Sequence, residues 1–284
     1  MEIITLIFSF LFGVVIGSFL NVLILRKGTG LGLSGRSMCF SCGKTLGFIE
    51  LIPIFSFLAQ GGKCKKCGSK ISIQYPLVEL VSGLIVMGMS YLWLINFDFS
   101  SYAWGAFVLK TSAILALLSL SVYDLKHKII PDSFSAWFSL SALIAIFWDF
   151  YFKQGIGSDI VNSHIPNTPV WFVLTGVSFF LIFAFVWVIS KGKWIGFGDA
   201  KLVLGIGFLL GPIEGVSALI LAFWAGALYG IFHLLVSHIR SKMNKGKLSH
   251  EIPFAPFLAI GTIVAVIYHV DLLSLAPILA LFYV

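Results

Sequence analysis

The four cysteines of this chain are spaced as a metal-binding set. They form two Cys-x-x-Cys pairs, each directly followed by glycine: Cys39 and Cys42, then Cys64 and Cys67. Four thiolates in two such pairs can close a tetrahedral zinc site, and the glycines suit a tight turn in which backbone amides face the sulfurs. Two disulfides or a redox pair are the alternatives. The loop that carries both pairs contains Lys44, Lys63, Lys65, Lys66 and Lys70, which places it in the reducing cytoplasm and favours zinc.

Two aspartates lie where a membrane boundary is expected. Asp124 ends an apolar run, and Asp199 opens another one within the sequence Gly196-Phe-Gly-Asp-Ala-Lys201. An ionisable group at membrane depth is costly and is therefore a candidate for function. Two such carboxylates brought together share one proton, so the ionised one can activate water while the protonated one polarises a scissile carbonyl. The pair therefore predicts aspartic peptidase chemistry.

The residues alone leave simpler roles open for these acids. Asp199 could be no more than a helix cap, and Asp124 could simply form an ion pair with a nearby lysine at the membrane surface. Asp132 follows a proline and is an even better helix cap, so we expect it to be structural. Glu79 begins the second apolar segment, where it favours the positive end of a helix dipole, and it is a secondary candidate.

The composition indicates that these residues are held in place by membrane-spanning helices. Of the 284 residues, 59% are hydrophobic and 11% are charged, against about 25% charged in a soluble domain. Repeated apolar runs of about 20 residues predict an all-α, polytopic membrane protein. We expect about eight transmembrane helices, at residues 3–25, 77–96, 103–123, 134–152, 170–190, 200–210, 216–237 and 254–284. The last stretch contains polar residues and is either one broken helix or a re-entrant pair.

The basic residues predict the orientation. All but three of the 19 lysines and arginines fall in alternate loops, the exceptions being Lys110, Lys153 and Lys201. The positive-inside rule makes these loops cytoplasmic and places the N-terminus outside. The net charge of +7 then reflects topology, and we expect membrane lipid but no nucleic acid as a partner. The first apolar run is too long for a signal peptide and lacks a basic start, so we expect it to stay in the protein.

Three segments follow from this pattern. Residues 1–26 are the first transmembrane helix, residues 27–76 a small cytoplasmic zinc-binding loop domain, and residues 77–284 a transmembrane peptidase domain. The loop domain is too short for a large hydrophobic core, so bound zinc would supply folding free energy. Gly30, Gly32 and Gly35 within it match a dinucleotide-binding pattern, but no βαβ unit surrounds them, and we interpret them as a flexible loop.

The ordered set of motifs resembles that of the bacterial type IV prepilin peptidases. The Gly-x-Gly-Asp motif alone is weak, because presenilin-like intramembrane proteases also have it. The whole set is specific, and it spans nearly the entire chain. Its parts are Gly17-Ser-Phe-Leu-Asn21, both cysteine pairs, Ile71-Ser-Ile-Gln-Tyr-Pro-Leu-Val-Glu79, Asp124 through Ile130-Pro-Asp132, Gly196-Phe-Gly-Asp-Ala-Lys201 and Pro253-Phe-Ala-Pro-Phe257.

The resemblance implies a bifunctional enzyme of the bacterial inner membrane. It would cleave the short basic leader of prepilin-like and pseudopilin-like proteins on the cytoplasmic side, with Asp124 and Asp199 as the catalytic pair. It would also methylate the new N-terminal residue with S-adenosylmethionine, an activity linked to the 27–76 domain. Two positions depart from the usual family pattern: Phe40 replaces a proline in the cysteine domain, and Ala255 replaces a glycine between two late prolines. Neither change affects the aspartate pair.

Two other function classes remain in competition. A proton-coupled transporter would also place carboxylates in the membrane, but near its midplane and with broken helices in matching halves. A non-catalytic assembly scaffold would explain the zinc domain but gives the aspartates no role. The boundary positions of Asp124 and Asp199 favour the peptidase.

Overall fold

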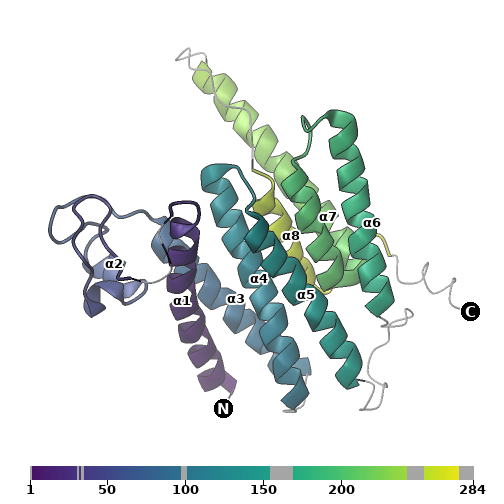
Figure 1. The fold of residues 1–284 in the computed structure, drawn as a ribbon, viewed down its shortest axis with the longest axis horizontal. Coiled ribbons are helices and arrows are strands. Elements are labelled where there is room, and N and C mark those ends of the chain that lie inside the picture. Colours follow the sequence, from purple (N-terminus) through teal and green to yellow (C-terminus); the bar gives the residue numbers. More distant parts are fainter. Residues whose placement is uncertain are drawn as a thin grey trace, which may run out of the picture. The chain divides into compact units, whose positions relative to one another are not determined.

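A computed structural model describes residues 2–30, 32, 35–96, 101–153, 169–241 and 253–274. The chain forms two compact units, Met1–Phe99 and Ser100–Val284. The described residues are helical apart from loops and two isolated β-bridges, which confirms the all-α class (Figure 1). Six of the described helices are long and apolar enough to cross a membrane, judged by length and composition.

The first unit is built on two packed helices. Helix α1 (Glu2–Arg26) contacts α3 (Gln74–Asn96), and the segment between them contains the short helices η1 (Phe48–Leu51) and α2 (Phe55–Ala59). Glycines allow a close approach: a Cβ on Gly13 would lie 2.7 Å from the Ser82 carbonyl oxygen, and one on Gly17 would lie 2.7 Å from Glu79 Cα. Small residues four positions apart are a common contact surface between membrane helices.

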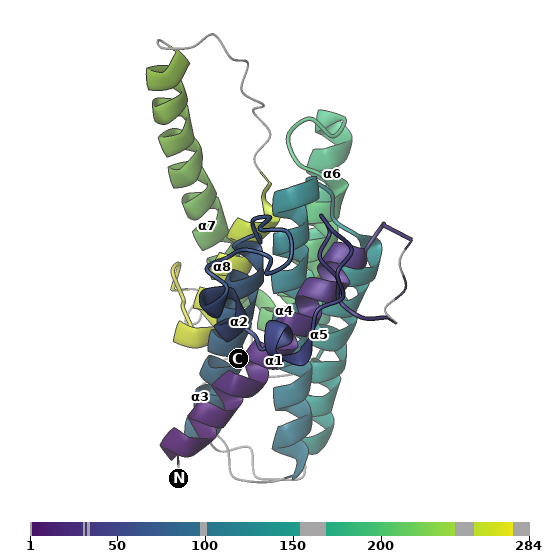
Figure 2. The ribbon, with the colours of Figure 1, turned by 90° about the vertical axis from the view of Figure 1, so that its left-hand side faces the viewer.

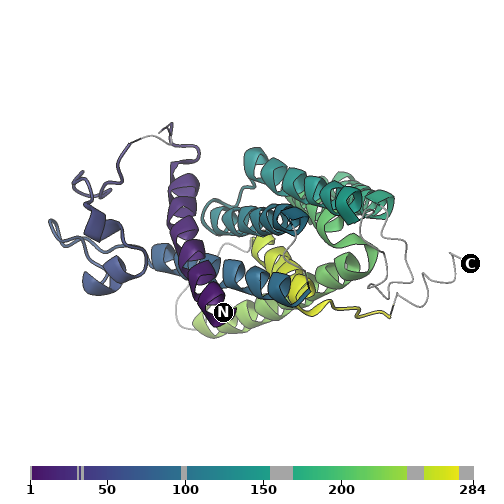
Figure 3. The same cartoon turned by 90° about the horizontal axis from the view of Figure 1, so that it is seen from below.

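The second unit is a ring of four helices with a fifth on its outside. Its helices are α4 (Ser101–His127), α5 (Asp132–Lys153), α6 (Pro169–Ser190), α7 (Phe197–Ser241) and α8 (Ala255–Tyr268). Contacts run from α4 to α5, from α5 to α7, from α7 to α8 and from α8 back to α4. Helix α8 lies between α4 and α7 (Figure 3). Helix α6 packs mainly on α7.

Helix α7 contains two of the predicted helices. The expected segments 200–210 and 216–237 are its two helical parts, separated by the non-helical residue Gly211 (φ 70°, ψ −165°) just before Pro212. Proline lacks the N–H that a continuous helix needs, and it suits the first turn of the second half. The far half projects beyond the other helices of its unit (Figure 2).

The predicted segment 254–284 contains one short helix, α8, which ends at Tyr268. Residues beyond 274 lie outside the described part of the chain. The eight expected segments therefore correspond to six long helices and the shorter α8 in the described ranges.

Candidate functional site

Asp124 lies in the last turn of α4, three residues before the helix ends at His127. Its side chain is buried, with the residue 5% exposed. Its Oδ2 atom accepts a hydrogen bond of 3.3 Å from the backbone N–H of Ala255, the first residue of α8. The first N–H groups of a helix have no partner within that helix. Asp124 therefore provides a hydrogen-bond acceptor for the first N–H group of α8, although it lies 131 residues earlier in the chain.

Asp199 lies in the first turn of α7 and is 8% exposed. Its Oδ2 atom accepts a hydrogen bond of 3.2 Å from the backbone N–H of Gly196. Gly198 serves a different purpose, because a Cβ there would lie 2.7 Å from Cβ of Ile130 in the α4–α5 connection. The two glycines of the motif thus hold the carboxylate and let α7 begin directly against the end of α4.

The structure brings the two aspartates to the same end of the second unit. Asp124 is near the C-terminus of α4, and Asp199 is at the N-terminus of α7, where Gly198 packs against Ile130 of the α4–α5 connection. Both carboxylates are largely removed from water, and charges in the protein interior interact more strongly than charges in solvent. Two buried carboxylates on different helices can hold one water molecule and one peptide group between them. Their catalytic role remains a prediction.

Asp132 has a different environment. It begins α5, and its side chain is 80% exposed. Its Oδ1 atom is 2.5 Å from Nζ of Lys201, which also lies 5.2 Å from the ring centroid of Phe197. An exposed ion pair of this kind stabilises a fold by about 0–1 kcal/mol. This partner was not predicted from the sequence, although Lys201 is one of the three basic residues outside the alternate basic loops.

Two matching turns present the cysteine sulfurs in the first unit. The carbonyl oxygens of Cys39 and Cys64 accept hydrogen bonds of 2.9 Å from the N–H groups of Gly43 and Gly68. The two glycines have φ values of 67° and 69°, a conformation that residues with a Cβ rarely adopt. Glycine after each pair is therefore required by the backbone of the turn.

The sulfurs are placed to bind one metal ion. The four Sγ atoms lie within 4.8 Å of one another, and those of Cys39 and Cys67 are 3.9 Å apart. Tetrahedral zinc with Zn–S bonds of about 2.3 Å requires sulfurs about 3.8 Å apart. All four cysteines are free thiols, not the two disulfides of the alternative interpretation. The donor set and its spacing fit a zinc ion.

The thiols do not ionise alike. Backbone N–H groups, that of Cys42 first, lower the pKa of Cys39 to about 6, and the Ser69 hydroxyl lowers the pKa of Cys67. The backbone N–H of Lys44 favours the thiolate of Cys42, but burial and the neighbouring sulfurs outweigh it and raise the pKa to about 11. Adjacent thiolates repel one another, so a divalent cation at their centre would favour ionisation of all four.

The first unit also contains buried polar residues between α1 and α3. Glu79 is 6% exposed, and its Oε2 atom accepts a hydrogen bond of 2.7 Å from the N–H of Ile54. Asn21 is 1% exposed and donates from Nδ2 to the Tyr75 carbonyl oxygen over 3.1 Å. From the sequence, Glu79 was only a secondary candidate, and Asn21 was recognised only as part of a motif. A polar residue inside an apolar run was the signal that could have identified Asn21.

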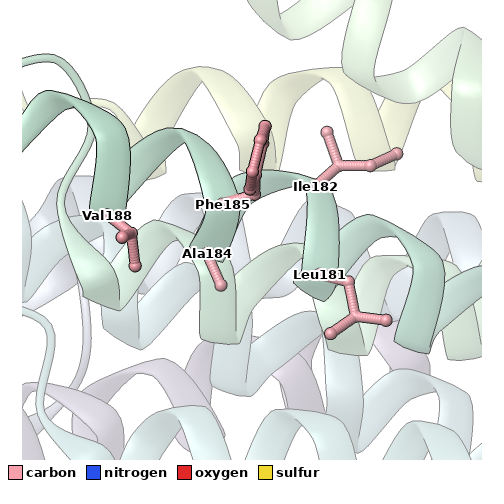
Figure 4. Close-up of a pocket in the computed structure, with 5 residues that line it drawn as sticks. All are labelled: Leu181, Ile182, Ala184, Phe185 and Val188. Carbon is pink, nitrogen blue, oxygen red and sulfur yellow. The ribbon is translucent and has the colours of Figure 1, made fainter.

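A hollow on α6 offers no further chemistry. It is lined by apolar side chains of this one helix, and Figure 4 shows them spread along its face: Leu181, Ile182, Ala184, Phe185 and Val188. Four of them are exposed, as expected for a helix face that contacts lipid.

The amino-acid sequence matches two family models in succession. Residues 11–93 match the bacterial peptidase A24 N-terminal domain, and residues 111–231 match the type IV leader peptidase family. The prepilin leader peptidase/N-methyltransferase of Bacillus subtilis (strain 168) is 31% identical over 266 residues, which cover 93% of this chain and 95% of the relative. This chain belongs to the type IV leader peptidase family. The resemblance found in the motifs is thereby confirmed.

Other family members are similar along most of the chain. The protein of the same name from Myxococcus xanthus (strain DK1622) is 32% identical over 233 residues, covering 81% of this chain and 64% of the relative. The one from Burkholderia pseudomallei (strain 1026b) is 28% identical over 283 residues, with 90% and 83% covered. No solved structure matches. The two family matches lie one in each structural unit, with the cysteines in the first and the aspartates in the second.

Proposed function

We propose that this chain is a membrane-embedded aspartic endopeptidase that removes the short basic leader of type IV prepilin-like proteins and then methylates the new N-terminus. The family and the names of its members support both activities. The observation that carries the peptidase is the position of Asp124 and Asp199, which are buried at the same end of the second unit and come from different helices.

The two carboxylates divide the work of peptide hydrolysis. The ionised one takes a proton from a water molecule, whose oxygen forms a bond to the scissile carbonyl carbon. The protonated one donates a hydrogen bond to the carbonyl oxygen and stabilises the charge that develops there. The C–N bond then breaks, and the leaving nitrogen receives a proton from the pair. Because the N–H groups of Ala255 and Gly196 hold one oxygen of each carboxylate, the other oxygen is oriented for water and substrate.

The location of the pair suits a substrate that is itself a membrane helix. A prepilin has an apolar helix directly after its leader, so its scissile bond lies at the membrane boundary. Asp124 is three residues from the end of α4, and Asp199 is in the first turn of α7. A transporter would place such acids near the middle of its helices. We infer that the aspartates, the cysteine loop and the other basic loops face the cytoplasm of a bacterial inner membrane, with the N-terminus outside.

The cysteine loop would bind one structural zinc ion through Cys39, Cys42, Cys64 and Cys67. S-adenosylmethionine would supply a methyl group carried on a sulfonium sulfur. We assign methylation to the region that includes residues 27–76, because the segment is separate from the aspartates and lies in the N-terminal family domain. The peptidase then belongs to the 77–284 segment.

Cleavage of a synthetic prepilin-like substrate by the purified protein in detergent tests this proposal. We expect Asp124→Asn and Asp199→Asn each to lower kcat by at least about 10³-fold, because asparagine keeps the shape but cannot ionise. The double variant should be little worse than either single variant, since the pair acts as one unit. Asp132→Asn is the matched control and should keep most of the activity. Wild-type cleavage by either dyad variant would rule out the aspartic mechanism.

A further inference from the structure

A cluster of buried polar side chains lies where α1 meets α3, and neither the zinc site nor the aspartate pair uses it. It consists of Asn21 on α1 with Glu79 and Ser82 on α3, all of them buried. Gly17 adjoins two of them, because a Cβ there would lie 2.7 Å from Glu79 Cα and 2.9 Å from Ser82 Oγ. Asn21 is one helical turn further along the same face of α1. The three side chains therefore share one stretch of the helix contact.

The cluster has more acceptors than donors. Asn21 Oδ1 and Ser82 Oγ are buried without a hydrogen-bond partner. The Glu79 carboxylate has the Ile54 N–H and the Ser18 hydroxyl as partners. No lysine, arginine or histidine of the described ranges forms an ion pair with Glu79. Unpaired acceptors and an uncompensated carboxylate are costly to bury, and such groups in a membrane protein generally mark a site.

The backbone next to Glu79 is strained. Ile54 has φ 61° and ψ −54°, the conformation at the centre of a γ-turn, which is unfavourable for a β-branched residue. The N–H of Ile54 donates to Glu79, so the carboxylate also fixes the cysteine-containing loop to α3. Strain of this kind persists only where the surroundings impose it, and here Glu79 contributes to imposing it.

The acceptors identify the chemical class of the ligand. A carboxylate, an amide oxygen and a hydroxyl together match a group with several N–H donors and a positive charge. Cleavage produces such a group, a primary α-ammonium, at the membrane boundary. Glu79 is the sixth residue of α3, about 7.5 Å along the helix from its start. We propose that Glu79, Asn21 and Ser82 bind the α-ammonium of the processed substrate for methylation, an assignment that rests on the proposed function.

The carboxylate would then serve as the base of the methyl transfer. An α-amino group has a pKa of about 7.7–8.0, so it is mostly protonated at neutral pH and has no free electron pair. Glu79 accepts one proton, and the nitrogen electron pair forms a bond to the methyl carbon of the sulfonium donor. The C–S bond breaks, and its electrons remain on sulfur as a neutral thioether. General base catalysis of this kind contributes about 10²–10⁴-fold.

Binding without a methyl donor tests the site directly. The probes are a peptide that begins at the mature N-terminus and its N-acetylated twin, added to the full-length protein in detergent. The wild type should prefer the free amine by about 10–100-fold, the effect of a charge-assisted hydrogen bond. Glu79→Gln should abolish this preference, while glutamine still accepts from Ile54 and zinc content stays normal. Ser82→Ala should reduce the preference, and Ser90→Ala, also buried in α3, should not.

Activity assays separate this inference from the proposed function. In Glu79→Gln, methylation of a pre-cleaved substrate should fall at least about 10²-fold, and leader cleavage should stay within about twofold. A wild type that neither cleaves nor methylates would contradict the proposed function itself. A wild type that does both, with unchanged amine preference in Glu79→Gln, would overturn only the ammonium site. If Glu79→Gln loses zinc, the comparison of amine preference between Ser82→Ala and Ser90→Ala tests the ammonium site instead.

The same variants distinguish the two cations of the reaction. The second pair of probes is S-adenosylmethionine and its neutral thioether product. We expect their relative affinities to be the same in the wild type and in Glu79→Gln, because a sulfonium offers no N–H donor to Asn21 or Ser82. If Glu79→Gln instead removes a preference for the sulfonium and keeps that for the free amine, the cluster binds the methyl donor and the ammonium assignment is wrong.

Discussion

Gly198 allows the peptidase proposal to be tested without changing either carboxylate. It is the residue before Asp199, and a Cβ there would lie 2.7 Å from Cβ of Ile130, 2.9 Å from its Cδ1 and 3.2 Å from its Cγ1. Ile130 is β-branched and precedes a proline, so both its side chain and its backbone are restricted. We expect Gly198→Ala to move the first turn of α7 away from the end of α4.

The size of the effect follows from these distances. To reach an ordinary contact, the two Cβ atoms must separate from 2.7 Å to at least 3.4 Å, a shift of about 0.7 Å. A misplacement of about 1 Å at a reacting group can cost about 10²-fold in rate. Overpacking costs about 1–3 kcal/mol, and alanine in place of helical glycine recovers about 1 kcal/mol. The variant should therefore fold and cleave about 10–100-fold more slowly than the wild type.

The assay is the steady-state rate of leader cleavage, with the Tm of the purified protein as the measure of folding. Gly226→Ala is the matched control, because it makes the same change in the same helix and its nearest atom would be 3.5 Å away, an ordinary contact. It should cleave at the wild-type rate. Cleavage by Gly198→Ala within about twofold of the wild type, or an equal loss in Gly226→Ala, would refute the reasoning.

Three further predictions concern the metal and the end of the second unit opposite to the aspartates. Elemental analysis of chelator-washed protein should give about one zinc per chain, and a value near zero would exclude a structural zinc site. The double variant Cys39→Ser with Cys64→Ser should lose metal binding and methylation. Full methylation by that variant would show that methylation does not depend on the metal-binding loop. The Glu214 carboxylate, 2.8 Å from Nδ1 of His269, raises the pKa of that imidazole above 6.5. The pair therefore stabilises the fold fully below about pH 6.5, and its contribution disappears as the pH rises through the raised pKa. The difference in Tm between the wild type and His269→Gln should accordingly shrink from about pH 6 to about pH 9, and a constant difference would show that the ion pair is not responsible.

The sequence by itself determined the properties that depend on composition and on short spacings. Apolar runs of membrane length need no tertiary contact to be recognised, because the cost of exposing them to water is a property of each segment. The turns after Cys39 and Cys64 are equally local, since glycine four residues after each cysteine supplies the left-handed backbone. The ordered motifs were enough to predict the family. Asp199 was a candidate because an acid directly before an apolar run is costly wherever that run packs.

Only the tertiary structure decided which distant residues meet. The partner of Asp124 is the backbone N–H of Ala255, and that of Asp132 is Lys201, a pairing that no local pattern predicts. The burial of Asn21 and Ser82 against each other's helices was equally inaccessible from the sequence. Such contacts depend on the rotation and register of packed helices. These are set by where a glycine lets two backbones approach, and therefore by both partners at once.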